Sequence, residues 1–286
     1  MKLSKWKILE IIRRKNEGWT TYKVKKKYGI SIRRINQIYS YYLHNREPPA
    51  IGRRMGRPTR PMKKEEIETV QKHYQKYRAS ATTLEKTILR DEGWHIPHNH
   101  IHKILVSLGN AKKMNKTHIR KKKWIRYERR HSLTAVHLDW YYDTNTEIWA
   151  LPAIDDASRK MLALVEVKSP TTDASILTMN EALKHGRIKQ CITDHGTQFT
   201  KNNGSSRFSE FLETHGIQHI LCRIKHPQSN GKSEKFNDLY KNHRHAFSSK
   251  NEFIHWYNEV RPHRSLRFEM LETPAQAFER KMKTEV

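Results

Sequence analysis

Two aspartates, Asp139 and Asp194, belong to short apolar segments of the kind that form buried strands. Asp139 lies within TAVHLDWYY, which we expect to be a strand, and Asp194 ends the segment KQCITD. Neighbouring central strands of one sheet would bring the two carboxylates side by side. Close carboxylates repel each other unless a cation lies between them, and hard oxygen ligands select Mg²⁺ or Mn²⁺. The two segments therefore predict a metal site at Asp139 and Asp194.

A third acid, Glu234, lies in the stretch SNGKSEKFNDLYKNHRHAF, which we expect to be a helix. A glutamate between two lysines ordinarily indicates a solvated surface. Four polar residues, however, share one helix face at spacings of 4, 3 and 4: Asn230, Glu234, Asn237 and Lys241. The apolar residues Phe236, Leu239 and Tyr240 would point toward a core. An acid, two amides and a lysine can bind metal, sugar-phosphate and phosphate.

Other acids of the same region compete with Asp139 for the role of first metal ligand. Asp155 and Asp156 stand in IDDASRK, where a strand ends before a tight turn, and Asp143 lies in another turn. Aspartates are common in turns because their side chains hydrogen-bond the nearby backbone. We therefore prefer Asp139 as the first ligand and keep Asp155 as the alternate.

Five apolar segments bounded by turns predict the strands that position these acids. They span residues 134–142, 147–155, 160–168, 189–194 and 217–222. Amphipathic helices are expected at 172–186 and 208–216. This order implies an α/β fold over residues 131–286, with a mixed five-stranded sheet and flanking helices. Pro152 lies inside the second strand and disturbs it.

Residues 1–45 predict three short helices, the last two of them joined through Gly29. Ser31 would cap the third helix, IRRINQIYSYY, whose apolar side packs on the other two. This arrangement is typical of an all-α helix-turn-helix module, whose last helix presents polar side chains to a DNA groove. A three-helix bundle without that role is the alternative. The residues expected to face DNA are Arg33, Arg34, Asn36 and Gln37.

Residues 46–61 contain four prolines, two glycines and several arginines, and predict a linker. Its Gly-Arg-Pro sequence resembles the hooks that place arginine in a narrow minor groove.

Residues 62–110 repeat the three-helix plan as a second helix-turn-helix module. His98 and His102 have a zinc-ligand spacing, but no cysteine or further histidine pair completes four ligands, so groove-facing histidines are preferred. Residues 111–130 form a basic connector suited to the DNA backbone.

The chain as a whole is strongly basic. Lys and Arg total 56 against 29 Asp and Glu in 286 residues, so the formal charge is +27 and the pI about 10.1. Because basic residues recur along most of the chain, nucleic acid is favoured as the partner over a membrane surface. No stretch approaches the ~20 apolar residues of a membrane-spanning helix. The only cysteines, Cys191 and Cys222, form no CxxC pair, so we expect a reducing, cytoplasmic setting with association to the nucleoid.

Candidate DNA contacts outside the first module fall in the linker, the second module, the connector and the last third of the chain. In chain order they are Arg53, Arg54, Arg57, His98, Asn99, Lys121, Lys122, Lys123, Asn230, Lys232, Asn237, Lys241, Arg261 and His263.

Five motifs in order resemble those of DDE transposases of insertion sequences, which have a retroviral-integrase-type, RNase H-like core. They are ERRHSLTAVHLDW, AIDDASRK, ITDHGTQF, HPQSNGKSEKFN and WYNEVRPHRSLRFEMLETPAQAF, and the resemblance covers residues 128–278. It implies a catalytic and metal-binding triad of Asp139, Asp194 and Glu234. Two departures are that 39 residues separate Asp194 from Glu234, more than in retroviral integrases, and that Val136 stands where tryptophan is usual. Neither removes the triad, nor does Asp238, which stands where retroviral integrases have a basic residue.

The resemblance implies a transposase that binds the ends of a mobile DNA element and, with a pair of Mg²⁺ or Mn²⁺ ions, cleaves and joins DNA strands. A homo-oligomer on DNA is expected because two element ends must be joined in one event. One alternative is a DNA-binding regulator derived from a transposase, with an inactive core. Another is a ribonuclease on RNA–DNA hybrids, which needs no pair of helix-turn-helix modules.

Overall fold

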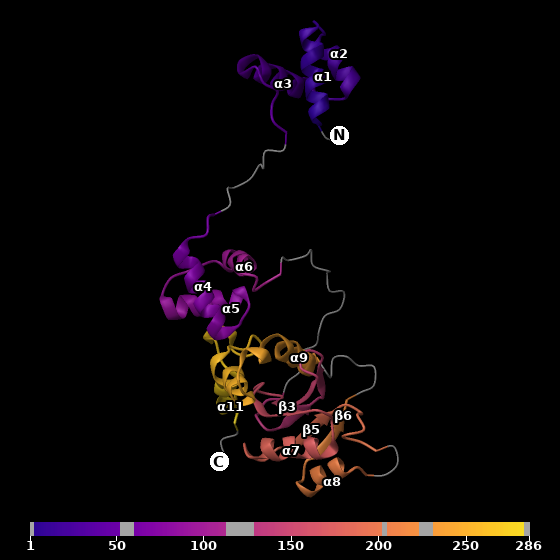
Figure 1. Cartoon of the computed structure of the whole chain (residues 1–286), viewed down its shortest axis with the longest axis vertical. Coiled ribbons are helices and arrows are strands. Elements are labelled where there is room, and N and C mark those ends of the chain that lie inside the picture. Colours follow the sequence, from indigo (N-terminus) through magenta and orange to yellow (C-terminus); the bar gives the residue numbers. More distant parts are fainter. Residues whose placement is uncertain (1–2, 52–59, 113–128, 202–204, 223–230, 283–286) are drawn as a thin grey trace. The chain divides into compact units, whose positions relative to one another are not determined.

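The computed structural model describes residues 3–51, 60–112, 129–201, 205–222 and 231–282, with backbone alone at 231–234. The chain divides into two compact units, Met1–Pro61 and Met62–Val286 (Figure 1). Each unit is described by itself.

The first unit contains the three predicted helices, α1 (Lys5–Asn16), α2 (Thr21–Tyr28) and α3 (Ile32–Asn45). Each begins at a hydroxyl residue whose side chain accepts a backbone N–H of the first turn, a common N-terminal cap. Ile11, Val24 and Ile35 have no exposed surface and form the centre of the unit. The buried stripe of each helix thus faces the other two.

The second unit begins with α4 (Lys64–Tyr77), α5 (Ala81–Glu92) and α6 (His98–Ser107). These three helices share a core of their own and also contact the C-terminal part of the chain. The indole N–H of Trp256 donates to the carbonyl of Lys76 at 3.0 Å. The second helical module and the α/β region therefore belong to one compact unit.

The sheet has six strands among the described residues, where the sequence predicted five. They are β1 (Ala135–Leu138), β2 (Tyr141–Asp143), β3 (Ile148–Asp155), β4 (Met161–Val167), β5 (Gln190–Thr193) and β6 (Gln218–Leu221). The order is β2-β3-β1-β5-β6, with β4 pairing on β3. Strands β1, β5 and β6 run parallel, and β3 runs antiparallel to β1, β2 and β4, so the sheet is mixed as predicted.

The extra strand arises because the predicted first strand is interrupted at Asp139. The register of β1 on β3 continues unchanged into β2, which sets Asp139 opposite Pro152. The N–H of Asp156 donates to the carbonyl of Ala135 at 2.9 Å, and in an antiparallel ladder such bonds recur at every second residue. The N–H of residue 152 would therefore donate to the carbonyl of Asp139. Proline has no N–H, so the ladder breaks at this point.

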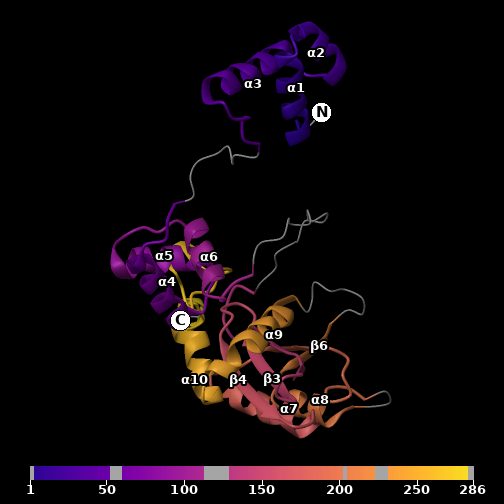
Figure 2. The same cartoon turned by 45° about the horizontal axis from the view of Figure 1, so that its top comes forward.

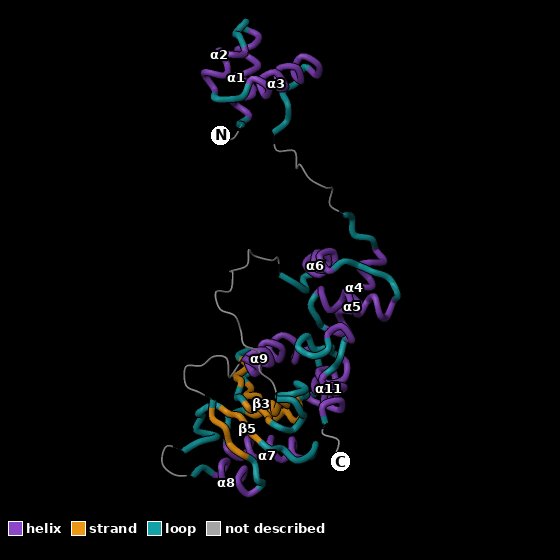
Figure 3. The backbone as a smooth tube through the Cα atoms, turned by 180° about the vertical axis from the view of Figure 1, so that it is seen from behind, coloured by secondary structure: helices purple, strands orange, loops and turns teal. Residues whose placement is uncertain are grey.

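Helices cover both faces of the sheet (Figures 2 and 3). On one face, α7 (Thr172–Leu183) and α8 (Arg207–Thr214) bury a core that includes Val136, Leu138 and Cys191. On the other face, α9 (Gly231–His243) packs over β3 and β4. The alternation of β3 separates the two cores, since Leu151 and Ala153 belong to the first and Ala150 and Ile154 to the second.

The chain after α9 continues through α10 (Lys250–His255), a π-helical turn (Trp256–Val260) and α11 (Pro274–Lys281). Phe253, Trp256 and Tyr257 join the core beneath α9. Within the described residues, every helix is too short or too polar to cross a membrane.

Candidate active site

Three parallel strands end at the same level of the sheet. Ala135 pairs with Gln190 in β1 and β5, and continuing this register by four residues places Asp139 beside Asp194. In the same way, the pairing of β5 with β6 places Cys222 beside Asp194. The backbone N–H of Cys222 donates to the carbonyl of Thr193 at 2.8 Å, which extends the β5–β6 contact by one residue. The carboxyl ends of the parallel strands therefore bring Asp139, Asp194 and Cys222 together.

Asp139 belongs to the face of the sheet that α9 covers. The indole N–H of Trp140 donates to the hydroxyl of Ser175 on α7 at 3.3 Å, whereas the ring of Tyr141 lies 5.8 Å from that of Tyr240 on α9. Successive side chains in an extended chain point to opposite faces. Asp139, next to Trp140, is thus on the α9 face. It follows β1 directly and does not lie within the strand as predicted, because Pro152 interrupts the ladder there.

Asp194 is held by the turn that follows β5. Its carboxylate accepts the backbone N–H of Gly196 at 3.0 Å. A Cβ atom on Gly196 would lie 3.0 Å from that carboxylate oxygen and 2.8 Å from Oε1 of Gln198, so a side chain here would displace one of them. His195 contacts the carbonyl of Cys222 at 2.9 Å through Nε2 and ties the turn to the end of β6.

The thiol of Cys222 is affected by the charges of both carboxylates. Burial raises the pKa of its thiol above the ordinary value, and the negative charges of Asp139 and Asp194 raise it further. The two aspartates therefore lie close enough to one thiol to repel its thiolate. Sequence reasoning missed this role, because a cysteine outside a CxxC pair belongs to no recognisable motif. Its place as the last residue of a predicted strand was the available signal.

Glu234 lies in the first turn of α9, and its side chain is outside the described residues. The helix that carries it is firmly fixed. The hydroxyl of Tyr240 donates to Glu166 on β4 at 2.7 Å, and Arg244 donates to both oxygens of the same carboxylate at 2.7 and 3.1 Å. Phe236, Leu239 and Tyr240 are buried, as the helical spacing predicted. Glu234 thus belongs to a helix that packs on the face to which Asp139 belongs.

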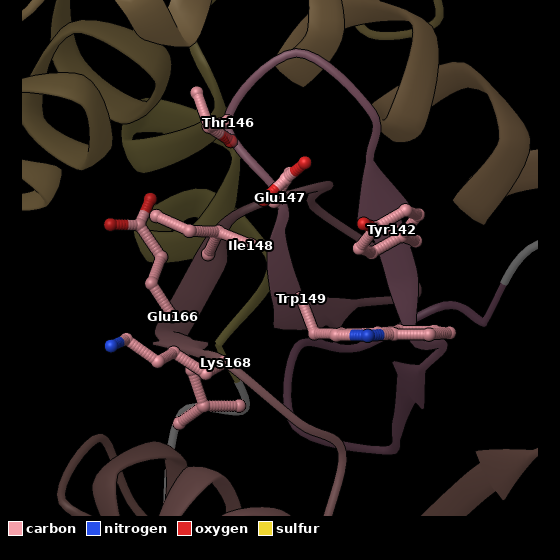
Figure 4. A pocket seen from close by; sticks show the side chains of 8 residues that line it. Tyr142, Thr146, Glu147, Ile148, Trp149, Glu166 and Lys168 are labelled. Carbon is pink, nitrogen blue, oxygen red and sulfur yellow. The ribbon is translucent and has the colours of Figure 1, made fainter.

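A groove of about 710 Å³ lies between the β2–β3 hairpin and the end of β4. Figure 4 shows Tyr142 and Trp149 on one side of it and Glu166 with Lys168 on the other. The rings of Tyr142 and Trp149 are 5.0 Å apart across the hairpin. Because Glu166 is already held by Arg244 and Tyr240, we do not assign it to a metal.

The alternate first ligand, Asp155, has a structural role. It lies opposite Val136, toward the other end of β1 from Asp139. Its carboxylate is fully buried and accepts the N–H of Leu133 at 2.8 Å and both the N–H and the hydroxyl of Ser158. Burial raises the pKa of this carboxyl group. Asp156 is likewise buried and lies 2.6 Å from Nε2 of His137. Both aspartates thus fix the β3–β4 turn.

The predicted DNA contacts differ in where the structure places them. The exposed ones are Arg33, Arg34, Asn36, Gln37, His98, Asn99 and Lys241. The half-buried ones are Asn237, Arg261 and His263. Outside the described residues are Arg53, Arg54, Arg57, Lys121, Lys122, Lys123, Asn230 and the side chain of Lys232.

Several of these residues have local partners; Arg34, for example, donates to the side chain of Gln37 at 3.2 Å. His98 lies on α6 with its Nδ1 3.1 Å from Glu85, which also contacts His95. The hydroxyl of Ser265 lies 2.8 Å from Nδ1 of His263. Among the described side chains, no group of three His, Cys, Asp or Glu residues could hold a metal ion.

The donor set at the strand ends fits a hard divalent cation. Asp139 and Asp194 supply carboxylate oxygens, and Glu234 would add another from α9. Burial and the acidic neighbours raise the pKa of the Cys222 thiol, which disfavours the thiolate that a soft metal would bind. The residues present therefore suit Mg²⁺ or Mn²⁺ better than zinc.

Comparisons with known proteins agree with this geometry. Models of the integrase core domain match residues 129–227 and 215–269. A protein of Spiroplasma virus SpV1-C74, named "Putative integrase ORF3", is 26% identical to this chain over 153 residues. The matched residues cover 45% of this chain and 42% of that protein. An uncharacterised protein of Archaeoglobus fulgidus is 29% identical over 93 residues, covering 32% of this chain and 75% of that protein.

Two further similarities are more limited. An uncharacterised protein of Caenorhabditis elegans, K02A2.6, is 32% identical over 92 residues, which span 32% of this chain but only 7% of that protein. A chain in the structure of the simian T-cell lymphotropic virus intasome with PP2A regulatory subunit B56 gamma aligns with a TM-score of 0.45 and 16% identity, covering 76% of each chain. Residues 129–269 thus match the integrase core domain, and a mixed sheet with helices on both faces fits such a core.

Proposed function

We propose that this chain is a transposase that binds the ends of a mobile DNA element and catalyses metal-dependent strand cleavage and strand transfer. The observation that carries the proposal is the placement of Asp139 and Asp194 at equivalent ends of neighbouring parallel strands, inside the integrase core domain. The helix that carries Glu234 packs on the face of the sheet to which Asp139 belongs. A net charge of +27 suits a DNA substrate.

In this proposal Asp139, Asp194 and Glu234 hold Mg²⁺ or Mn²⁺. The bound ions would supply Lewis acidity at the scissile phosphate and lower the pKa of an attacking water or hydroxyl group. Gly196 orients the carboxylate of Asp194 through its N–H. Water attack on a phosphodiester at the element end leaves a free 3′-hydroxyl. That hydroxyl then attacks a target phosphodiester, with a 3′-oxygen of the target as leaving group.

The helical modules α1–α3 and α4–α6 would recognise the element ends as helix-turn-helix units, and an oligomer of at least two copies would hold both ends. We also propose an intracellular, nucleoid-associated setting, as a DNA substrate requires. A regulator derived from a transposase and a ribonuclease H-like nuclease are the competing functions.

The experiment that separates the three functions is incubation of the purified chain with duplex DNA containing the inverted repeats that flank its gene. Nicking and joining in Mg²⁺ or Mn²⁺, abolished by excess chelator, support the proposal. Binding without cleavage, or cleavage of RNA–DNA hybrids alone, contradicts it.

Pro152 offers a sharper prediction about the site. Pro152→Ala adds an N–H opposite the carbonyl of Asp139, so β1 and β2 should join into one strand and draw Asp139 into the ladder. We expect nicking to slow by about tenfold, a change of roughly 1.4 kcal/mol in the barrier. The metal concentration for half-maximal rate should rise, while the melting temperature holds or increases.

The matched control is Pro170→Ala, which changes a proline outside the ladder, before α7. It should leave both the rate and the metal requirement unchanged. An unaltered metal requirement in Pro152→Ala would show that the break in the strand does not position Asp139.

A further inference from the structure

The junction between α4–α6 and the C-terminal helices is built from aromatic rings with arginines stacked on them. The rings of Phe247 and Trp256 are 5.1 Å apart. The guanidinium of Arg78, which follows α4, lies 5.7 Å from the ring of Phe247, and that of Arg261 lies 5.8 Å from the ring of Trp256. Arginine stacked on an aromatic face keeps its N–H groups at the edges free to bind an anion.

His243, the last residue of α9, lies among these charges. Its ring is 5.6 Å from that of Trp256. The pKa of His243 is lowered to about 4, first by burial and then by the positive charges of Arg261, Arg78 and His245. No carboxylate contributes to this shift. The described residues around His243 thus place two arginines about one imidazole without a compensating acid.

Arg261 has a buried N–H group for which the described residues supply no acceptor. Its Nε is sealed from solvent and makes no hydrogen bond with them. Burial lowers the pKa of the guanidinium. An unsatisfied buried donor on a charged group is costly, whereas Arg244 and Arg280 each bind a carboxylate through two nitrogens. The guanidinium of Arg261 therefore has donor capacity left for an anion.

A phosphodiester of DNA is the anion whose chemistry fits best. Guanidinium groups match phosphate oxygens with parallel N–H donors, and two arginines from different elements can grip one phosphate. A carboxylate from this chain would be expected to lie among the neighbours of His243, and the described residues supply none. The strongly basic chain makes a nucleic acid the partner most able to reach the cluster.

We propose that Arg78, His243 and Arg261 form a binding site for one backbone phosphate of DNA, shared between the second helical module and the catalytic core. The site rests on the proposed function, which supplies the DNA. It would fix the α4–α6 module and α9 to the same DNA segment. The helix that carries Glu234 would then have a fixed position on the DNA that the α4–α6 module binds.

The first test measures how binding of the full chain to duplex DNA depends on salt. Each phosphate neutralised contributes about 0.9 to the slope of log K against log salt concentration. The double variant Arg78→Gln/Arg261→Gln should bind several-fold more weakly and lose about 0.9 of slope. The single variants should lose overlapping, not additive, amounts because they share one phosphate. Arg207→Gln, an exposed arginine on α8 paired with Asp173, is the control and should keep the slope of the parent.

The second test follows the imidazole of His243 by NMR in the full chain, with His243→Gln identifying its signal. Saturating duplex DNA should raise the pKa of His243 toward its ordinary value, because the phosphate offsets the two arginines. An equal rise with inorganic phosphate alone would contradict a site for the DNA backbone. An unchanged slope in the double variant, or an unchanged pKa on saturation with DNA, would overturn the site even if the chain nicks DNA. Loss of slope and a raised pKa in a chain that never nicks DNA would instead overturn the proposed function and leave the site standing.

Discussion

Glu234→Gln should abolish metal-dependent nicking while leaving DNA binding intact. The substitution keeps the size of the side chain and its helix but removes the negative charge that a divalent cation needs. A metal ligand worth about 4 kcal/mol in the transition state corresponds to a loss of roughly 10³-fold in rate. The measurement is the single-turnover nicking rate on end DNA beside the dissociation constant for the same duplex. Asp139→Asn and Asp194→Asn should behave alike.

Two further variants distinguish the loss of a metal ligand from a general change of charge or a loss of stability. Glu213→Gln makes the same change at an exposed position on α8 and should leave the rate unchanged. Asp155→Ala removes a buried acceptor of three hydrogen bonds and should cost about 2–4 kcal/mol of unfolding free energy, visible as a lowered melting temperature. A fully active Glu234→Gln protein would remove this residue from the site. An Asp155→Ala protein that is stable but inactive would restore Asp155 as the first ligand.

The strands and their acids were largely predictable because the sheet follows local patterns. Apolar segments bounded by turns located every strand, but they did not show that the first segment is divided into β1 and β2. The spacing of apolar residues within α9 identified the buried side of that helix. The missed boundary depends on a contact between distant residues. Pro152 disturbs a strand by itself, but its effect on Asp139 emerges only when the β1–β3 register is known. Sequence spacing carries no information about that register.

The choice between Asp139 and Asp155 also needed the fold. Asp139 stands within one apolar segment and Asp155 ends another, and both were compatible with a metal site. In the antiparallel pairing of β1 with β3, Asp155 lies opposite Val136 near the start of β1, whereas Asp139 follows the end of β1. The parallel pairing of β1 with β5 then joins Asp139, and not Asp155, to Asp194. Cys222 was missed for the same reason, since only the β5–β6 pairing brings it to the aspartates.

The preference for element ends should depend on the first unit, the residues Met1–Pro61. On α3, Arg33, Arg34 and Gln37 are exposed while Ile35 and Ile38 are buried, so the polar side of the helix is available to a DNA groove. Replacing the three polar residues with alanine should cost about 1–3 kcal/mol for each base pair that the helix no longer recognises. The weakening should be seen on end DNA and not on random duplex, because base recognition carries the sequence information.

A fragment of residues 62–286 extends this test without cutting into a core. Its boundary follows the division between the two compact units and keeps α4, whose Lys76 carbonyl binds Trp256. We expect the fragment to bind DNA with a steep salt dependence but with a much weaker preference for end DNA. Arg13→Ala, on the exposed side of α1, is the control in the full chain; it should weaken binding to all duplexes equally or not at all. If the fragment selected end DNA over random duplex as well as the full chain does, recognition would lie in the second module or the core, and the exposed face of α3 would have another use.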